Sequence, residues 1–227
     1  MSFFDLVPWK DGHVIEIAFD TGHFDAVGFG PAPGSTSHTE VLTDLLGPDV
    51  LIQTSKLNTK APGGGAAVEW HQDWAFYPHS NDDMLAVGLM LEDVDEANGP
   101  LMVVPGSHRV YVACVGATPA DHYKASLKKQ EYGVPDMQSL ERLAANEGVE
   151  AMKGRAGSVI LFDCNAMHGS NSNISPYPRC NLFMVYNSVE NALGPPLFGL
   201  KPRPEFIAAR EHVAPLEPVR TDYSAWR

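Results

Sequence analysis

The chain has 227 residues, 44% of them hydrophobic, and a formal net charge of −12. This length and composition suit one domain over residues 1–227 with a substantial core, and the acidic balance argues against a nucleic-acid partner, which needs a basic surface. No apolar run approaches the roughly 20 residues that cross a bilayer, and the start lacks the regions of a signal peptide, so we expect no membrane partner and a cytoplasmic location.

The first half of the chain predicts few regular elements before its core strands. Gly28–Ser35 is expected to be an exposed loop, and Thr39–Leu46 a short helix with a polar N-terminal cap. Gly63–Gly65 predicts a flexible turn rather than a phosphate loop, because no Gly-Lys-Ser/Thr follows it. Met84–Leu91 has the continuous apolar character of a core strand, and the acidic run Glu92–Glu96 predicts a solvated turn after it.

Residues 115–153 differ from their flanks in charge and periodicity. Pro119–Glu131 and Pro135–Glu147 have helical spacing and mixed charge, between segments that read as strands. This pattern predicts a helical insertion. Two roles remain open for it: a lid over the barrel mouth, or a brace on the outside of the barrel.

The last part of the core is predicted to be a hairpin. Ser158–Asp163 reads as one strand, residues 171–178 as a loop rich in Asn, Ser and Pro, and Asn181–Tyr186 as the returning strand. Arg179 would lie near the start of the return, close enough to His168 to face the same cavity. The three cysteines are odd in number and have no metal spacing, so a disulfide framework is not expected.

The pattern that carries chemistry is His71-Gln72-Asp73, followed far along the chain by His168. Residues i and i+2 of a strand point to the same face, so His71 and Asp73 would present an imidazole and a carboxylate to one point. With His168 from a second strand they form the two-histidine, one-carboxylate set that holds non-haem Fe(II) and leaves coordination positions open. Other histidines lack a donor at a convincing ligand spacing and are not expected to bind the metal: His13, His23, His38, His79, His108 and His122.

Arg179 supplies the second element of this hypothesis. A guanidinium pairs well with a carboxylate in bidentate geometry. An open iron site beside such a cation fits 2-oxoglutarate, whose keto-acid end chelates iron and whose far carboxylate needs a positive partner. The carboxylate ligand Asp73 also predicts hydroxylation rather than halogenation, because halogenating oxygenases replace it with a small residue.

At this point the sequence resembles a known family, the phytanoyl-CoA dioxygenase family of Fe(II)/2-oxoglutarate oxygenases. The resemblance covers about residues 50–210, and its second half is similar to the ectoine hydroxylases within the family. It rests on these stretches: Trp70–His79, Asn98–Arg109, Cys114–Gly116, His122–Lys124, Ser126–Pro135, Phe162–Asn165 through Asn173, and Val185–Asn191.

The resemblance implies an all-β core with peripheral helices, folded as a double-stranded β-helix (a jelly-roll, cupin-like fold), and a possible homodimer. It also implies that the N-terminal part, residues 1–45, is shorter than the helical lead-in usual in the family, which would leave the site more open or have a partner chain cover it. The implied cofactor is Fe(II), with 2-oxoglutarate and O2 as cosubstrates.

Carried over residue by residue, the resemblance assigns roles to ten positions. Iron would be held by His71, Asp73 and His168. The 2-oxoglutarate would be held by Asn58, Ser170 and Arg179. Substrate would be contacted at Thr54, Tyr77, Asn181 and Phe183.

Two of these positions depart from the ectoine hydroxylases, which have glutamine where this chain has Thr54 and tryptophan where it has Tyr77. An aromatic face for a cationic ring is kept at Tyr77, whereas the amide at Thr54 is lost. We therefore expect a dioxygenase that hydroxylates an unactivated C–H bond of a small metabolite, with release of succinate and CO2. Ectoine 5-hydroxylation is the alternative. Two further alternatives are a zinc-dependent hydrolase, since the same ligands can bind Zn(II), and a non-catalytic jelly-roll binding protein.

Overall fold

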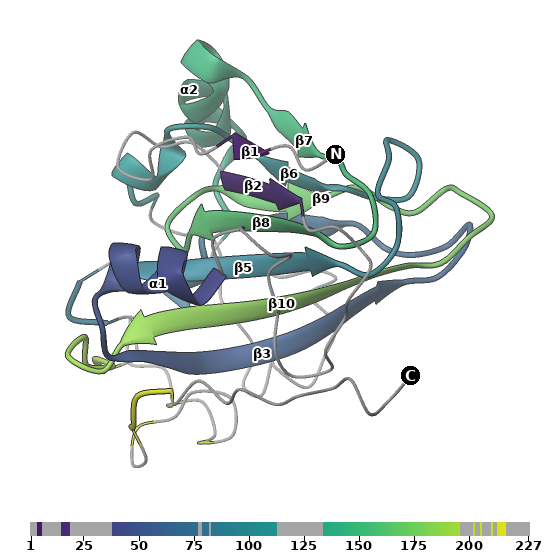
Figure 1. The fold of residues 1–227 in the computed structure, drawn as a ribbon. Helices are drawn as coiled ribbons and strands as arrows, with labels where there is room; N and C mark the ends of the chain where they lie inside the picture. The colour runs from purple at the N-terminus through teal and green to yellow at the C-terminus, as the bar shows by residue number, and fades with distance from the viewer. Residues whose placement is uncertain are drawn as a thin grey trace, which may run out of the picture.

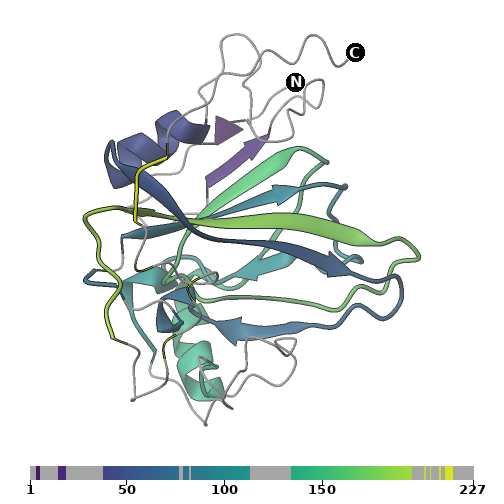
Figure 2. The same ribbon diagram turned by 90° about the horizontal axis from the view of Figure 1, so that it is seen from below.

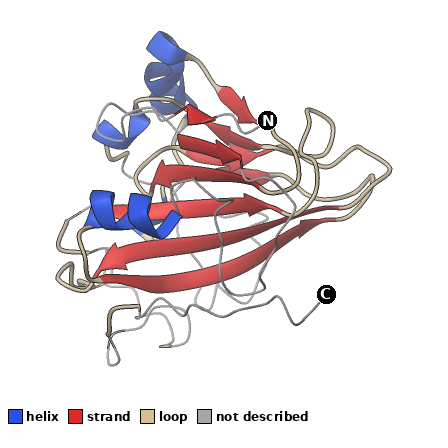
Figure 3. Ribbon diagram, viewed as in Figure 1, coloured by secondary structure: helices blue, strands red, loops and turns tan. Residues whose placement is uncertain are grey.

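The computed structural model describes residues 4–5, 15–18, 38–76, 79–81, 83–112, 134–195, 202, 205, 210 and 213–216, with side chains placed from residue 41 onward. In this part of the chain two antiparallel sheets face each other, and two α-helices lie outside them (Figures 1 and 3). None of the described helices is long and apolar enough to cross a membrane.

The larger sheet has six strands. Their spatial order is β1 (Phe4–Asp5), β2 (Ile15–Ala18), β8 (Ser158–Asp163), β5 (Met84–Met90), β10 (Arg179–Ser188) and β3 (Val50–Lys60). All seven residues of β5 are buried. The central position of β5 explains its continuous apolar sequence, because both of its faces are covered.

The smaller sheet has four strands, in the order β4 (Val68–His71), β9 (His168–Ser170), β6 (Leu101–Val103) and β7 (Glu150–Met152). Between the sheets lies a core that includes Met84, Ile160, Phe162 and Val185. Two facing antiparallel sheets around one core form the jelly-roll that the resemblance implied, and this prediction of the fold is confirmed.

The helix α1 (His38–Leu46) covers the outer face of the larger sheet (Figure 2). Its residues Val41, Leu42 and Leu46 pack against apolar side chains of β5, β8 and β10. The short helix predicted over Thr39–Leu46 is confirmed. The centre of the sheet is therefore buried on both sides, by α1 on one and by the smaller sheet on the other.

The helix α2 (Met137–Glu147) lies beside the smaller sheet (Figure 2). Asp136 caps its N-terminus by accepting a hydrogen bond from the backbone N–H of Ser139. Leu140 packs against Val104 and Met167, and Met167 directly precedes His168. This contact favours a bracing role for α2. The predicted helical insertion over 115–153 is wrong at its end, because Glu150–Met152 forms the strand β7 of the smaller sheet. Pro119–Glu131 lies outside the described residues.

The predicted hairpin between Ser158–Asp163 and Asn181–Tyr186 is wrong, although both strands exist. β8 and β10 do not pair with each other; they flank β5, which pairs with both. Between them the chain crosses to the smaller sheet to form β9 and then returns. A run of apolar residues identifies a strand but does not name its partner, and the closure of the jelly-roll decides the pairing here.

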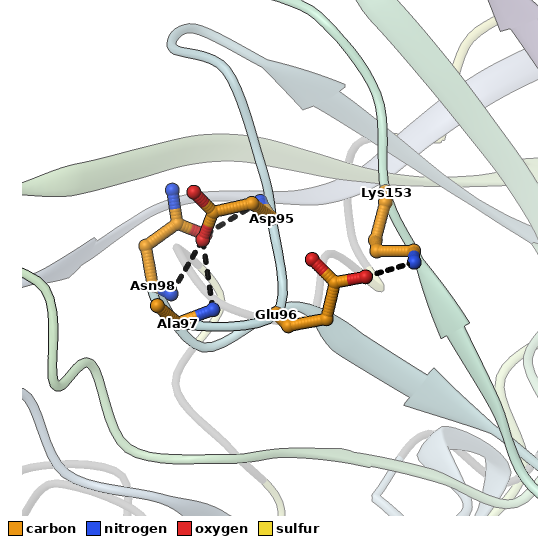
Figure 4. Close-up of polar contacts among 5 residues, drawn as sticks. All are labelled: Asp95, Glu96, Ala97, Asn98 and Lys153. Atoms are coloured by element: carbon orange, nitrogen blue, oxygen red, sulfur yellow. Dashed lines mark hydrogen bonds and ion pairs between the residues drawn. The ribbon is translucent and has the colours of Figure 1, made fainter.

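The acidic turn after β5 is confirmed, and its carboxylates hold the turn together (Figure 4). Asp95 accepts hydrogen bonds from the backbone N–H groups of Ala97 and Asn98. The amide oxygen of Asn98 accepts one from the N–H of Asp95, and Glu96 pairs with Lys153. These contacts fix the loop that leads to Gly99, a residue that touches the candidate site.

Candidate metal centre

Three potential metal ligands converge where the smaller sheet faces the core. His71 ends β4, Asp73 begins the 3-10 turn η2 (Asp73–Ala75), and His168 begins β9. One ligand atom from each lies within 4.8 Å of the other two. The Nε2 of His71 is 3.6 Å from one carboxylate oxygen of Asp73, and the Nε2 of His168 is 3.8 Å from the other. Among the described residues this is the group of His, Cys, Asp and Glu side chains that could hold a metal ion.

The expected convergence of His71 and Asp73 is found, but Asp73 is not on a strand as predicted. β4 ends at His71 and Asp73 opens η2. The intervening Gln72 keeps an extended conformation, with φ −118° and ψ 126°. This conformation still turns the side chains of its two neighbours to one side, so the ligand pair survives the end of the strand.

Both histidines are held in the tautomer that leaves Nε2 free. The Nδ1 of His71 lies 2.7 Å from the carbonyl oxygen of Glu69, and the Nδ1 of His168 lies 2.9 Å from that of Ala166. A carbonyl oxygen can only accept, so each Nδ1 carries the hydrogen and each Nε2 presents a lone pair. This is the arrangement usual for histidines that bind metals.

Electrostatics keep His71 neutral in the metal-free protein. Burial first, and the neighbouring His168 second, lower the pKa of His71 to about 4, and the positive charge of Lys56 acts in the same direction. A neutral imidazole is the form that binds a metal.

Gln72 anchors the segment between the two ligands, a role that the sequence analysis missed. It is 1% exposed. Its Nε2 donates to the carbonyl oxygens of Val110 (2.9 Å) and Asn165 (2.6 Å), and its Oε1 accepts from the N–H of Val112 at 2.9 Å. A polar residue in the middle of a His-x-Asp motif gives no sign of this, because its partners come from distant loops.

Arg179 and Asn58 meet on neighbouring strands of the larger sheet. The Nη1 of Arg179 donates to the Asn58 side-chain oxygen at 3.2 Å, and Nη2 donates to the carbonyl oxygen of Gly99 at 2.5 Å. The residue is 2% exposed, and among the described residues its Nε has no hydrogen-bond partner and no carboxylate lies within ion-pairing distance of it. The Glu92 carboxylate acts on its charge only from beyond that distance, so the direct contacts of this buried cation are neutral oxygens.

Lys60 lies directly opposite Arg179 in the β3–β10 pair and is 3% exposed. Its Nζ donates to the carbonyl oxygens of Ala66 (2.5 Å) and Asn171 (2.8 Å). Burial and the Arg179 charge lower the pKa of Lys60 to about 8. A Cβ at Gly99 would lie 2.6 Å from the Asn171 carbonyl oxygen and 2.8 Å from the Lys60 side chain, so only glycine fits at this position.

The other predicted contact residues share the inner face of β3 and β10. Directly opposed residues of an antiparallel pair point to the same side, and Thr54 faces Val185, a residue of the core between the sheets. Asn181 and Phe183 follow Arg179 at alternate positions of β10 and share its face. Asn181 is 1% exposed, and neither end of its amide has a hydrogen-bond partner in the described part of the chain. The ring of Phe183 lies over Gly88 of β5.

Ser170 is two residues after His168 on β9 and so lies on the same face of the smaller sheet. Phe162, which the sequence analysis did not assign to the site, packs edge-on against His168 with ring centroids 4.9 Å apart.

Tyr77, a predicted substrate contact, lies outside the described residues. His79 and His108 are described and neither joins the metal group.

The donor set fits a mononuclear metal with open positions. Two neutral imidazoles and one carboxylate from a single side suit non-haem Fe(II), and the orphaned guanidinium of Arg179 suits a carboxylate-bearing ligand nearby. The three candidate ligands thus lie on the smaller sheet and in the turn that follows β4, and the inner face of the larger sheet carries the polar groups of Arg179, Asn58 and Asn181.

Comparisons with known proteins agree with this geometry. The sequence profile of the phytanoyl-CoA dioxygenase (PhyH) family matches residues 20–181. The ectoine dioxygenase of Bordetella parapertussis is 54% identical over 180 residues, which are 77% of this chain and 58% of that protein. The ectoine dioxygenase of Halomonas elongata is 46% identical over 169 residues, 72% of this chain and 51% of that protein. The chain therefore spans little more than half the length of these relatives.

Solved structures show the same likeness. EctD from S. alaskensis with 2-oxoglutarate and 5-hydroxyectoine superposes with a TM-score of 0.66 at 41% identity, covering 79% of this chain and 59% of that one. The structure of the same protein with bound Fe gives a TM-score of 0.66 at 35% identity, covering 87% of this chain and 73% of that one.

Proposed function

This chain belongs to the phytanoyl-CoA dioxygenase family, and from that premise we propose that it is an Fe(II)- and 2-oxoglutarate-dependent dioxygenase that hydroxylates an unactivated C–H bond of a small metabolite. The products would be the hydroxylated metabolite, succinate and CO2. The observation that carries the proposal is the buried Arg179, which has no carboxylate partner among the described residues and lies in the same fold as the His71, Asp73 and His168 group. A zinc hydrolase would have no use for such a cation.

In this proposal His71, Asp73 and His168 hold iron, which when bound supplies the activation of O2 that is coupled to oxidative decarboxylation of 2-oxoglutarate. The chain's own residues bind the metal and the organic molecules and orient them. The carbonyl oxygens of Glu69 and Ala166 fix the two imidazoles with Nε2 facing the metal, so ligand geometry is set before the metal arrives.

Arg179 would bind the distal carboxylate of 2-oxoglutarate. Asn58 and the Gly99 carbonyl oxygen hold its guanidinium in place, so little rotamer entropy remains to be lost on binding. Ser170, on the same face as His168, would donate its hydroxyl to the same cosubstrate. Burial of the guanidinium strengthens its attraction for an anion, because there is little water to screen the charge.

Substrate contacts are proposed at Thr54, Asn181, Phe183 and Tyr77. The unpaired amide of Asn181 offers both a donor and an acceptor, and the ring of Phe183 offers an apolar face. The best candidate substrate is ectoine, because several relatives at 42–54% identity are ectoine dioxygenases. Thr54 in place of the family's glutamine is the feature that favours another small metabolite. A homodimer and a cytoplasmic location stay predictions.

The test is an aerobic assay of the iron-loaded protein with 2-oxoglutarate and ectoine, in which succinate and the organic product are measured together. We expect succinate and a product with one added oxygen atom in equal amounts, and neither without O2. Asp73→Ala removes a metal ligand and should abolish both products. The matched control is the exposed Asp136→Ala at the start of α2, which should leave the ratio and rate of product formation unchanged. Failure to consume 2-oxoglutarate with any metabolite tested, by a protein that holds iron, would contradict the proposal.

A further inference from the structure

The strand β3 contains a bulge at the residue before Thr54. In its pairing with β10, Ile52 stands opposite Tyr186 and Thr54 opposite Val185, so Gln53 has no partner of its own. Tyr186 belongs to the core under α1 and Val185 to the core between the sheets, which places Ile52 on the outer face and Thr54 on the inner face. Gln53 is 6% exposed, whereas Ile52 is 38% exposed. The bulge therefore puts two consecutive side chains, Gln53 and Thr54, on the inner side of the sheet.

The amide of Gln53 is only half satisfied. Its Oε1 lies 3.3 Å from the Nε2 of His79, which is 5% exposed. Its Nε2 is buried and has no hydrogen-bond partner among the residues that the structure describes. If the amide were turned over, the oxygen would be the unpaired atom, so one end is unpaired in either orientation. A buried polar group without a partner destabilises the folded state, and such groups in folded proteins commonly have a functional reason.

The surroundings of Gln53 link it to the candidate site. His79 follows Asp73 by six residues, so the contact joins the bulge of β3 to the segment that leaves the metal ligands. On the same strand, Thr54, Lys56 and Asn58 continue the inner face toward Arg179. Bulges frequently occur beside active sites, where they redirect a side chain. An unpaired donor at this position lies at the opposite end of the β3 inner face from Arg179.

We propose that the unpaired amide of Gln53 binds the organic substrate, by donating a hydrogen bond from Nε2 to a carboxylate or carbonyl oxygen of a small metabolite. This inference rests on the proposed function. His79 holds the amide in orientation. The bulge contributes to specificity because it turns the side chain of Gln53 to the inner face of the sheet.

The experiment separates a substrate contact from a purely structural role. Gln53→Glu keeps an oxygen that can accept from His79 but replaces the Nε2 donor by a second oxygen. Binding of ectoine to the anaerobic Fe(II)- and 2-oxoglutarate-loaded enzyme is measured by calorimetry, together with 2-oxoglutarate affinity and Tm. We expect ectoine to bind about 10- to 100-fold more weakly to Gln53→Glu, with 2-oxoglutarate affinity within about twofold of wild type. Gln53→Leu, which removes both ends of the amide, should also weaken ectoine binding.

The matched control is Gln138→Glu, the same change on an exposed residue of α2, which should alter no ligand affinity. Wild-type affinity for ectoine in Gln53→Glu would overturn the inference. So would equal loss of 2-oxoglutarate affinity and Tm, which indicates a structural role. If wild type binds 2-oxoglutarate but not ectoine, the inference fails and the proposed cosubstrate chemistry stands. If wild type does not bind 2-oxoglutarate, the proposed function itself fails and the inference with it.

Discussion

His71 and His168 stand directly opposite each other in the antiparallel β4–β9 pair, with ring centroids 4.2 Å apart. Directly opposed residues of an antiparallel strand pair have their side chains side by side, so the backbone register alone brings two of the three ligands together. Asp73 then reaches both imidazoles from the turn that follows β4. A metal bound here would join two strands whose residues are far apart in the sequence.

Metal binding should therefore stabilise the fold. A ligand that binds only the native state at 100 times its Kd adds about 2.7 kcal/mol to the free energy of unfolding. We expect Fe(II), added anaerobically, to raise the Tm of wild type, and His168→Ala to remove the increase. Mg²⁺, which prefers oxygen ligands, serves as the control and should have no comparable effect. An equal Tm shift in His168→Ala would place the metal elsewhere.

The metal-free protein should lose stability as the pH falls through the range in which His71 titrates. Burial lowers the pKa of His71 from its usual 6.5 to about 4. Between these values the unfolded chain binds more protons than the folded one, so the free energy of unfolding decreases as pH drops from 6.5 to 4. Urea unfolding at several pH values should show a smaller slope in His71→Gln than in wild type. Identical slopes in the two proteins would contradict the assignment of this pH dependence to His71.

Replacing Gln72 by leucine should weaken metal binding, because Gln72 holds the segment between the ligands His71 and Asp73 in place. The change removes three hydrogen bonds, one of them fully buried, and leaves the Val110 and Asn165 carbonyl oxygens and the Val112 N–H without this partner. We expect a loss of roughly 2–4 kcal/mol in unfolding free energy and about 10- to 100-fold weaker Fe(II) binding. Chemical denaturation and metal titration measure both. Gln138→Leu on the exposed face of α2 is the control, and equal behaviour of the two variants would argue against the anchoring role.

Gly88→Ala should displace Phe183. A Cβ at this position would lie 2.7 Å from the Phe183 ring, so the ring must shift toward the smaller sheet or the strands must separate. We expect a cost of about 1–3 kcal/mol in unfolding free energy and a raised KM for the organic substrate with little change in 2-oxoglutarate affinity. Gly64→Ala is the matched control, since its nearest atom would be 3.9 Å away. A KM equal to wild type in Gly88→Ala would contradict a role of Phe183 in substrate binding.

Much of this architecture could be predicted from local sequence. The apolar run of β5, the periodicity of α1 and the strand β8 are local patterns, and the structure has them where expected. The pairing of strands could not be predicted in the same way. β8 and β10 both flank β5, an arrangement that depends on the path of the whole chain between two sheets and not on any short pattern.

The residues of the candidate site also include some that local sequence predicts and some that it does not. His71, Asp73 and His168 could be found because metal ligation needs particular residue types at a particular spacing. Gln72, Lys60 and Gln53 were missed, because each is an ordinary polar residue whose role depends on partners that the fold brings from elsewhere. The bulge that turns Gln53 inward leaves no mark in the sequence, since Gln-Thr fits a regular strand equally well.

The most direct test of the central claim is anaerobic titration of the Fe(II)-loaded protein with 2-oxoglutarate, followed by the visible metal-to-ligand charge-transfer band. Wild type should develop the band, and Arg179→Ala should need roughly 100-fold more 2-oxoglutarate to reach it, because a buried charge-assisted contact is lost. Asp136→Ala should titrate as wild type does. A wild-type protein that shows no band, or an Arg179→Ala variant that titrates identically, would contradict the account.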